Sequence, residues 1–268
     1  MFESVAWLAA ALAGAIYLLS PLVVRSTFRF FSRCSFTPLP LERLPESIST
    51  EFRRRISEFA HLGFELLGCF DCGALANDTH SYMAYSCNYS TNEFATVSAM
   101  VTPDGPASYI EFSSRFSNGC SIATNTNGIL PLLPANPAIR VFRFASVQKP
   151  RTLLQVHRQL TAKYAPGLAA LAESRDAEIQ RYARMLESIG PRLARDGYMM
   201  LQEEGNCFGL TWQGAIRMTW LGLWPITLVR KVVHRQAMQS ELNLLPTQTV
   251  SALEKARELP PSSQSGAA

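Results

Sequence analysis

The sequence lacks the short motifs that mark the common catalytic chemistries. It contains no GxSxG, no Walker phosphate-binding loop, no HExxH and no GxGxxG, the motifs typical of serine hydrolases, nucleotide-hydrolysing enzymes, zinc proteases and dinucleotide-binding enzymes. Acidic residues are few in the region expected to form strands, and none has a spacing typical of a general acid–base pair. These absences favour a non-catalytic protein.

Charge and cysteine are also scarce. Charged residues make up 17% of the chain, against about 25% in a typical globular protein, while the hydrophobic share of 47% is enough to build a core. The formal net charge of +4 is too small to indicate nucleic-acid binding, and we expect no nucleic-acid partner. Six cysteines spread over 268 residues are too sparse for a disulfide framework, so we expect reduced thiols.

One long hydrophobic run is present at the N-terminus. Residues 5–24 read VAWLAAALAGAIYLLSPLVV and hold no charged side chain, and a helix of this length spans about 30 Å, the thickness of a hydrocarbon core. The alternative, a cleaved signal peptide, requires a basic start and a shorter run, whereas Met-Phe-Glu precedes this one. We therefore predict that residues 1–25 form a transmembrane signal anchor.

The residues that flank this run predict its orientation. Arg25, Arg29 and Arg33 follow it, and Glu3 precedes it. The positive-inside rule then places the bulk of the chain on the cytoplasmic side, at the inner membrane if the protein is bacterial. We expect the three arginines to contact anionic membrane lipid, each contributing about 1 kcal/mol.

The chain behind the anchor divides by composition and periodicity. Residues 26–47 form a basic, proline-containing linker, and residues 48–165 form an α+β domain. That domain has a helix from about Ser49 and then strands separated by turn sequences such as Asn118-Gly119, which together predict an antiparallel β-meander with a flanking helix. The expected strands cover residues 64–70, 82–89, 94–101, 109–116, 121–126 and 139–147.

The remainder is expected to be mainly helical. Residues 166–245 contain a β-hairpin and an apolar helix rich in tryptophan and proline, and residues 246–268 have the composition of a flexible tail. Thr211 is the expected N-cap of the apolar helix, and Pro225 is expected to kink it. The other predicted elements are helices over 152–164 and 168–189, the latter closed by Gly190-Pro191, and hairpin strands over 198–201 and 207–210.

Residues 218–229, MTWLGLWPITLV, leave three alternatives open. Twelve uncharged residues are too few to span a bilayer and are more typical of a buried core helix. The second alternative is an interfacial or partner-facing helix that presents Trp220 and Trp224, and the third is a second span that includes the flanking residues.

The cysteines supply the candidates for chemistry. Cys69, Cys72, His80 and Cys87 are ligand types that zinc prefers, although only one CxxC pair is present and the other spacings are irregular. Small buried thiols in a sheet are the alternative. A redox site requires a CxxC at a helix N-terminus, whereas this one ends a predicted strand. His157 lies beside an apolar helix face and is expected to be a core-edge histidine rather than a base.

Together these patterns predict an α+β protein with one N-terminal transmembrane helix, an antiparallel meander and a mainly helical C-terminal section. The expected function is a membrane-tethered interaction or scaffold module on the cytoplasmic face, with membrane lipid and an unknown protein as partners and no cofactor. The alternative is a membrane-surface enzyme or a structural-metal protein that uses Cys69 and Cys72.

Overall fold

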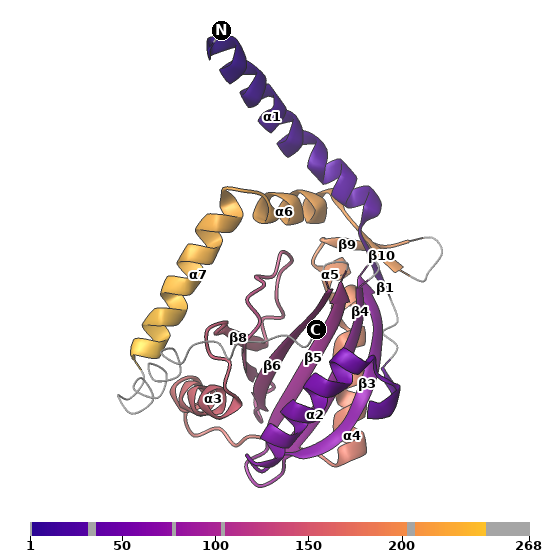
Figure 1. The fold of residues 1–268 in the computed structure, drawn as a ribbon, viewed down its shortest axis with the longest axis vertical. Coiled ribbons are helices and arrows are strands. Elements are labelled where there is room, and N and C mark those ends of the chain that lie inside the picture. Colours follow the sequence, from indigo (N-terminus) through magenta and orange to yellow (C-terminus); the bar gives the residue numbers. More distant parts are fainter. Residues whose placement is uncertain (1, 32–35, 77–78, 103–104, 203–206, 245–268) are drawn as a thin grey trace, which may run out of the picture.

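The fold is taken from a computed structural model, which describes residues 2–31, 36–76, 79–102, 105–202 and 207–244 (Figure 1). The predicted flexible tail, residues 246–268, lies outside the described residues. The helices are α1 (Phe2–Thr27), η1 (Leu41–Arg43), α2 (Glu46–Ala60), α3 (Pro150–Tyr164), α4 (Arg175–Glu187), α5 (Ile189–Arg195), α6 (Trp212–Gly222) and α7 (Ile226–Asn243).

The strands form one sheet, in the order β8-β7-β6-β5-β4-β3-β1-β10-β9, with β2 paired to β3. All pairs are antiparallel except β7 with β8, which is parallel. The strands are β1 (Arg29–Phe31), β2 (Thr37–Pro38), β3 (Glu65–Ala76), β4 (Thr79–Asn88), β5 (Glu93–Thr102), β6 (Gly105–Arg115), β7 (Ser121–Asn125), β8 (Ile139–Arg143), β9 (Met199–Leu201) and β10 (Cys207–Leu210). The α+β class and the meander from β3 to β7 are confirmed.

Alternating side chains on the sheet build a core on each face. One face carries Ala95, Val97 and Phe112, which pack with residues of α2 and α3 such as Phe52 and Leu153. The opposite face carries Phe70, Tyr85 and Phe94, which pack with Ile179 and Tyr182 of α4. This two-sided burial follows from the period of two along a strand.

Strand β1 joins the predicted hairpin of β9 and β10 to the meander. It lies within residues 26–47, which were expected to be a linker. Phe30 in β1 is opposite Phe208 of β10 on one side and opposite Ala76 of β3 on the other. The segments expected as separate regions therefore contribute to a single sheet. Sequence periodicity misses β1 because three residues are too few to establish an alternating pattern.

The helix predicted over residues 168–189 is wrong at both ends. Residues before Ser174 run along the sheet instead, because Leu171 N donates to Arg115 O at 2.9 Å and Ala170 forms a bridge with Phe116. At the other end, α5 continues through Gly190-Pro191. Pro191 is tolerated there because amides in the first turn of a helix have no intrahelical acceptor.

The apolar helix predicted from Thr211 to about residue 239 is two helices. Its start is confirmed, since Thr211 Oγ1 accepts a hydrogen bond from Gly214 N at 3.1 Å. The chain then breaks between Gly222 and Ile226, where α6 ends and α7 begins. Pro225 has no amide hydrogen to donate to the preceding turn, so a break replaces the expected kink.

The predicted transmembrane span, residues 5–24, falls within α1. The side chains of residues 6, 8–10, 12 and 13 lie outside the described set. Within the part of the chain that is described, no helix reaches the length and apolarity needed to cross a membrane. The span is therefore unsupported by the structure and stays a prediction.

Candidate membrane-contacting surface

The last turns of α1 are built into the folded domain. Val24, Phe28 and Phe30 pack against a buried cluster from α5, α6 and the hairpin. That cluster consists of Leu193, Met199, Phe208, Leu210 and Ala215. These contacts hold the C-terminal end of α1 against the domain, and Figure 1 shows the rest of the helix projecting away from the sheet.

Polar contacts tie α1 to both ends of α6. The Arg25 guanidinium lies 4.7 Å from the centre of the Trp212 ring, in cation–π contact at the first residue of α6. The Tyr17 hydroxyl donates to the backbone oxygen of Trp224, just after the last residue of α6. Two turns separate Tyr17 from Arg25, so α6 is held alongside this stretch of α1.

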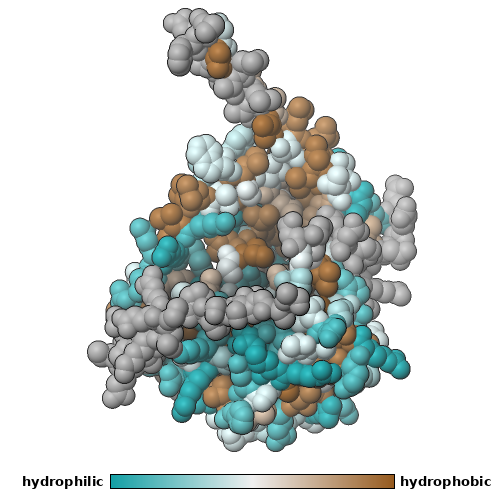
Figure 2. Space-filling model, viewed as in Figure 1, coloured by the Kyte–Doolittle hydropathy of each residue, from teal (hydrophilic) through white to brown (hydrophobic). Residues whose placement is uncertain are grey.

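Large apolar side chains are exposed on all three helices at this end of the molecule. On α6 only Gly214, Ala215 and Thr219 are buried, and on α7 only Leu242. Figure 2 shows apolar side chains gathered where α1 leaves the domain. We call the following exposed residues the α1–α6–α7 surface: Ile16, Leu18, Leu19, Leu22, Val23, Trp212, Ile216, Trp220, Trp224, Ile226, Leu228, Val229, Val232 and Val233.

The predicted interface residues lie on or beside this surface where they are described. Trp220 is 47% exposed and Trp224 is 72% exposed, so the core-packing alternative for residues 218–229 does not fit the structure. Arg25 is stacked on Trp212, and Arg29 Nη1 donates to Phe28 O at 2.9 Å. Arg33 lies outside the described residues.

The predicted zinc ligands are not brought together. Cys69 belongs to the core under α2 and α3, whereas Cys72 and Cys87 belong to the core under α4. His80 Nε2 lies 2.8 Å from Asp71 Oδ1 instead. Among the residues that the structure describes, no group of three or more histidine, cysteine, aspartate or glutamate side chains could hold a metal ion.

The same geometry bears on the thiol chemistry of Cys69 and Cys72. Residues three apart along a strand point to opposite faces, so the two thiols do not share a site. Burial, helped by the charge of Glu42, raises the pKa of the Cys69 thiol to about 11. Burial likewise raises the pKa of Cys87 to about 12. Protonated, buried thiols are poor nucleophiles and poor metal ligands.

His157 is a structural residue. Its ring is fully buried, with Nε2 2.9 Å from Ser114 Oγ and Nδ1 3.1 Å from Thr124 Oγ1. Burial lowers its pKa to about 4, so the neutral form is present at physiological pH. The sequence predicted a core-edge histidine, whereas the structure places the ring inside the core, where Ser114 and Thr124 lie within hydrogen-bond distance of its two nitrogens.

Sequence reasoning missed the extension of the apolar surface along α7. Val232 and Val233 are exposed there, but the neighbouring Arg230, Lys231 and Arg235 gave this stretch the composition of an ordinary solvated helix. An available signal was the spacing of Val229, Val232 and Val233, which places three valines on one helix face beside basic residues.

No protein-family model, curated protein or solved structure matches this chain. Function is therefore argued from the surface itself, and from its relation to the uncharged run in α1.

Proposed function

We propose that the protein is a single-pass, membrane-tethered, non-catalytic interaction module whose domain lies against the cytoplasmic face of the membrane. The observation that carries this proposal is the α1–α6–α7 surface. It joins the C-terminal end of the uncharged run at residues 5–24 to the exposed Trp212 and Trp220 of α6 and to Trp224 between α6 and α7. The tether and the lipid-contacting helices then form one rigid unit.

The residue types on this surface favour lipid as the occupant. Tryptophan concentrates at membrane interfaces, where its ring is half apolar and half wet, and arginine keeps its head in water while its stem lies along apolar surface. Arg25 stacks on Trp212, and Arg217 lies 5.6 Å from the centre of the Tyr198 ring and lines the same depression as Trp220. A protein partner on the same surface is the competing occupant.

The free energy gained by removing apolar side chains from water supports contact with the membrane. Moving a large apolar side chain fully out of water contributes roughly 1.5–3 kcal/mol. Even partial insertion of Trp220, Trp224 and Leu228 would therefore hold the domain against the bilayer. The alternative of an enzyme or metal protein using Cys69 and Cys72 has no geometric support, because these thiols lie on opposite faces of the sheet.

The test is the depth of single tryptophans in vesicles. The full chain carries four tryptophans, and three variants, each with the other three changed to phenylalanine, would retain only Trp7, Trp220 or Trp224. Each is reconstituted into vesicles with lipids brominated at shallow or deep positions along the acyl chain, and fluorescence quenching is measured. We expect shallow bromines to quench Trp7 more than deep ones, because Trp7 lies two residues, or about 3 Å, inside one end of the predicted span. Shallow bromines should also quench Trp220 and Trp224.

Two other results have distinct meanings. If Trp7 is quenched while Trp220 and Trp224 are untouched by any brominated lipid, α1 is only a tether and the surface serves a protein partner. If Trp7 is not quenched, the anchor itself is wrong. Far-UV circular dichroism of each variant serves as the folding control.

A further inference from the structure

Polar contacts fasten helix α7 to the domain near its two ends. Near its start, Arg230 donates to the backbone oxygens of Leu221 at 3.0 Å and Pro131 at 2.7 Å. Near its end, Glu241 accepts from Lys163 Nζ at 2.7 Å and from the Tyr164 hydroxyl at 2.6 Å. The turns between these anchors contain no buried residue.

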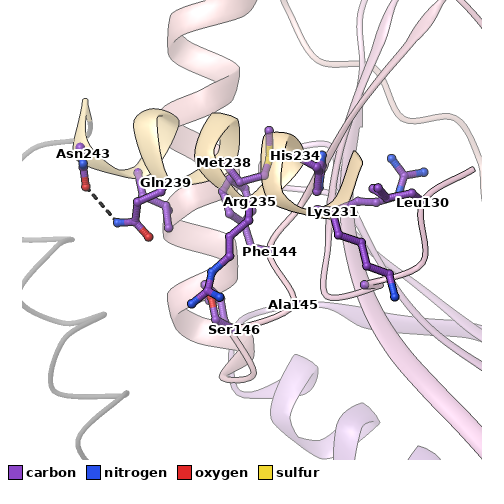
Figure 3. A pocket seen from close by; sticks show the side chains of 14 residues that line it. Leu130, Phe144, Ala145, Ser146, Lys231, His234, Arg235, Met238, Gln239 and Asn243 are labelled. Atoms are coloured by element: carbon purple, nitrogen blue, oxygen red, sulfur yellow. Dashed lines mark hydrogen bonds between the residues drawn. The ribbon is translucent and has the colours of Figure 1, made fainter. Parts of the chain in front are cut away.

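A cavity lies beneath this middle part of α7, with a volume of about 510 Å³. That volume is in the range of sites for small organic ligands, about 300–1,000 Å³. Its other wall is the chain that follows the edge strand β8. Figure 3 shows Arg235 extending from α7 on the side of Ser146 in that wall.

The charged part of the lining has one sign. Arg143, Lys231 and Arg235 contribute three fixed positive charges, with His234 beside them, and the lining contains no aspartate or glutamate. Among the described atoms, Arg143 Nε is buried without an acceptor, and His234 Nε2 is buried without a partner. Buried polar groups of native proteins are normally satisfied, so these two atoms point to a polar ligand.

The two unsatisfied atoms differ in kind. Arg143 Nε is a donor and suits a carboxylate or phosphate oxygen. The His234 ring hydrogen-bonds to the backbone of Arg143, and burial keeps its pKa below the usual value. When the other ring nitrogen donates to that backbone, Nε2 of the neutral ring is an acceptor that suits a ligand hydroxyl. A carboxylate or phosphate satisfies Arg143 Nε, and a head group that also carries a hydroxyl, as a lysophospholipid does, satisfies His234 Nε2 as well.

The rest of the lining is apolar. Phe144, Val147 and Leu242 belong to the core cluster under α2 and α3, and Met238 packs against it from α7. Leu130 also lines the cavity. A small inorganic anion would leave this part empty, whereas a hydrocarbon chain would fill it.

We propose that the α7 cavity binds an anionic amphiphile, a molecule with a carboxylate or phosphate head group and an acyl chain. The head group lies among Arg143, Lys231 and Arg235, and the chain lies against Phe144, Val147 and Met238. Free fatty acids and lysophospholipids share this chemistry. The cavity belongs to the domain core and to α7, so the inference does not depend on α1 entering a membrane.

The test is photo-labelling of the full chain in phosphatidylcholine nanodiscs with a diazirine-bearing fatty acid, and mapping of the labelled peptides by mass spectrometry. Mapping separates binding in the cavity from partition into the bilayer. We expect labels on the peptides that contain residues 143–147 and 231–242. Unlabelled oleate and lysophosphatidic acid should compete, and their relative potency distinguishes a carboxylate from a phosphate ligand. Uncharged oleyl alcohol and inorganic phosphate should compete at least tenfold more weakly than the better of the two.

Two pairs of variants sharpen the test. Lys231→Gln with Arg235→Gln should reduce labelling about tenfold, since each lost charge-assisted contact weakens binding. Arg175→Gln with Arg184→Gln changes the charge equally on the exposed side of α4 and should have no effect. Met238→Trp should obstruct the apolar part of the cavity and reduce labelling, while Ala237→Trp, on the exposed side of the same helix, should not.

Three results would overturn the proposal. The first is labelling that oleyl alcohol competes as well as oleate does. The second is labelling that the lysine–arginine pair and the control pair reduce equally. The third is labelling confined to peptides outside the cavity. The vesicle depth measurements on Trp220 and Trp224 test the proposed membrane contact independently of the cavity. The membrane-contact proposal and the cavity proposal can therefore each fail without the other.

Discussion

His157 couples the stability of the domain to pH. Its pKa is lowered by burial to about 4 from the ordinary 6.5. Above pH 6.5 the ring is neutral in both the folded and the unfolded chain. As the pH falls from 6.5 to 4, only the unfolded chain gains the proton, so the free energy of unfolding decreases. When the pH is lowered from 7 to 5, we expect His157 to reduce the free energy of unfolding by about 2 kcal/mol.

The measurement is urea unfolding of the wild type and of His157→Gln at pH 7 and pH 5. Glutamine keeps a donor and an acceptor for Ser114 and Thr124 but does not titrate. The variant should be less stable at pH 7, yet it should lose about 2 kcal/mol less than the wild type on acidification. Equal losses in both proteins would contradict the assignment.

Glu178 is a second buried polar residue with a structural role. It is fully buried, accepts from Arg115 at 2.6 Å and from Arg181 at 2.8 Å, and also accepts from the backbone of Glu173. Glu178→Gln should lower the free energy of unfolding by about 3 kcal/mol, because two arginines lose their buried partner.

Glu173→Gln is the matched control. Glu173 is 48% exposed and also pairs with Arg115, so its loss should cost less than about 1 kcal/mol. Chemical denaturation at pH 7 distinguishes the two.

At the scale of elements, the sequence predicted those strands and turns that depend on residues close together in the chain. The meander followed from alternating apolar residues and from turns such as Asn118-Gly119, where Gly119 adopts a φ of 80°. Strand β1 and the stretch around Ala170 could not be predicted, because their partners are distant in sequence. Such pairings depend on how the whole sheet closes and leave no local periodicity. Of the candidate surface, Trp220 and Trp224 were named from the sequence under one of three alternatives, while Trp212 and the extension along α7 were not.

The N-cap of α6 gives a prediction at this scale. Thr211 Oγ1 accepts from Gly214 N at 3.1 Å and donates to Gly197 O at 2.6 Å. Thr211→Ala removes both hydrogen bonds and should lower the free energy of unfolding by about 1–2 kcal/mol. Thr211→Ser keeps the hydroxyl and should remain within about 0.5 kcal/mol of the wild type. If the two variants are equally stable in urea unfolding, the cap does not stabilise α6.

At the scale of the whole molecule, the proposed anchor and the positive flank imply a topology that two cysteine positions can report. Cys120 is exposed in the turn between β6 and β7, on the side proposed to be cytoplasmic. Ser4 is exposed near the start of α1, on the opposite side of the run at residues 5–24. A membrane-impermeant maleimide added to intact cells should therefore leave Cys120 unlabelled until the membrane is permeabilised. It should label Ser4→Cys at once in a Cys120→Ser background.

Cys120→Ser alone measures the background from the remaining thiols, of which Cys69, Cys72 and Cys87 are buried and Cys207 is partly exposed. Labelling of Cys120 in intact cells, with protection of Ser4→Cys, would show that the arginine flank does not set the orientation. Protection of both positions would show that the run does not cross the membrane, and the α1–α6–α7 surface would then be the only contact with lipid. Labelling of Ser4→Cys alone is the result that the positive-inside rule requires, since Arg25 and Arg29 lie on the other side of the run.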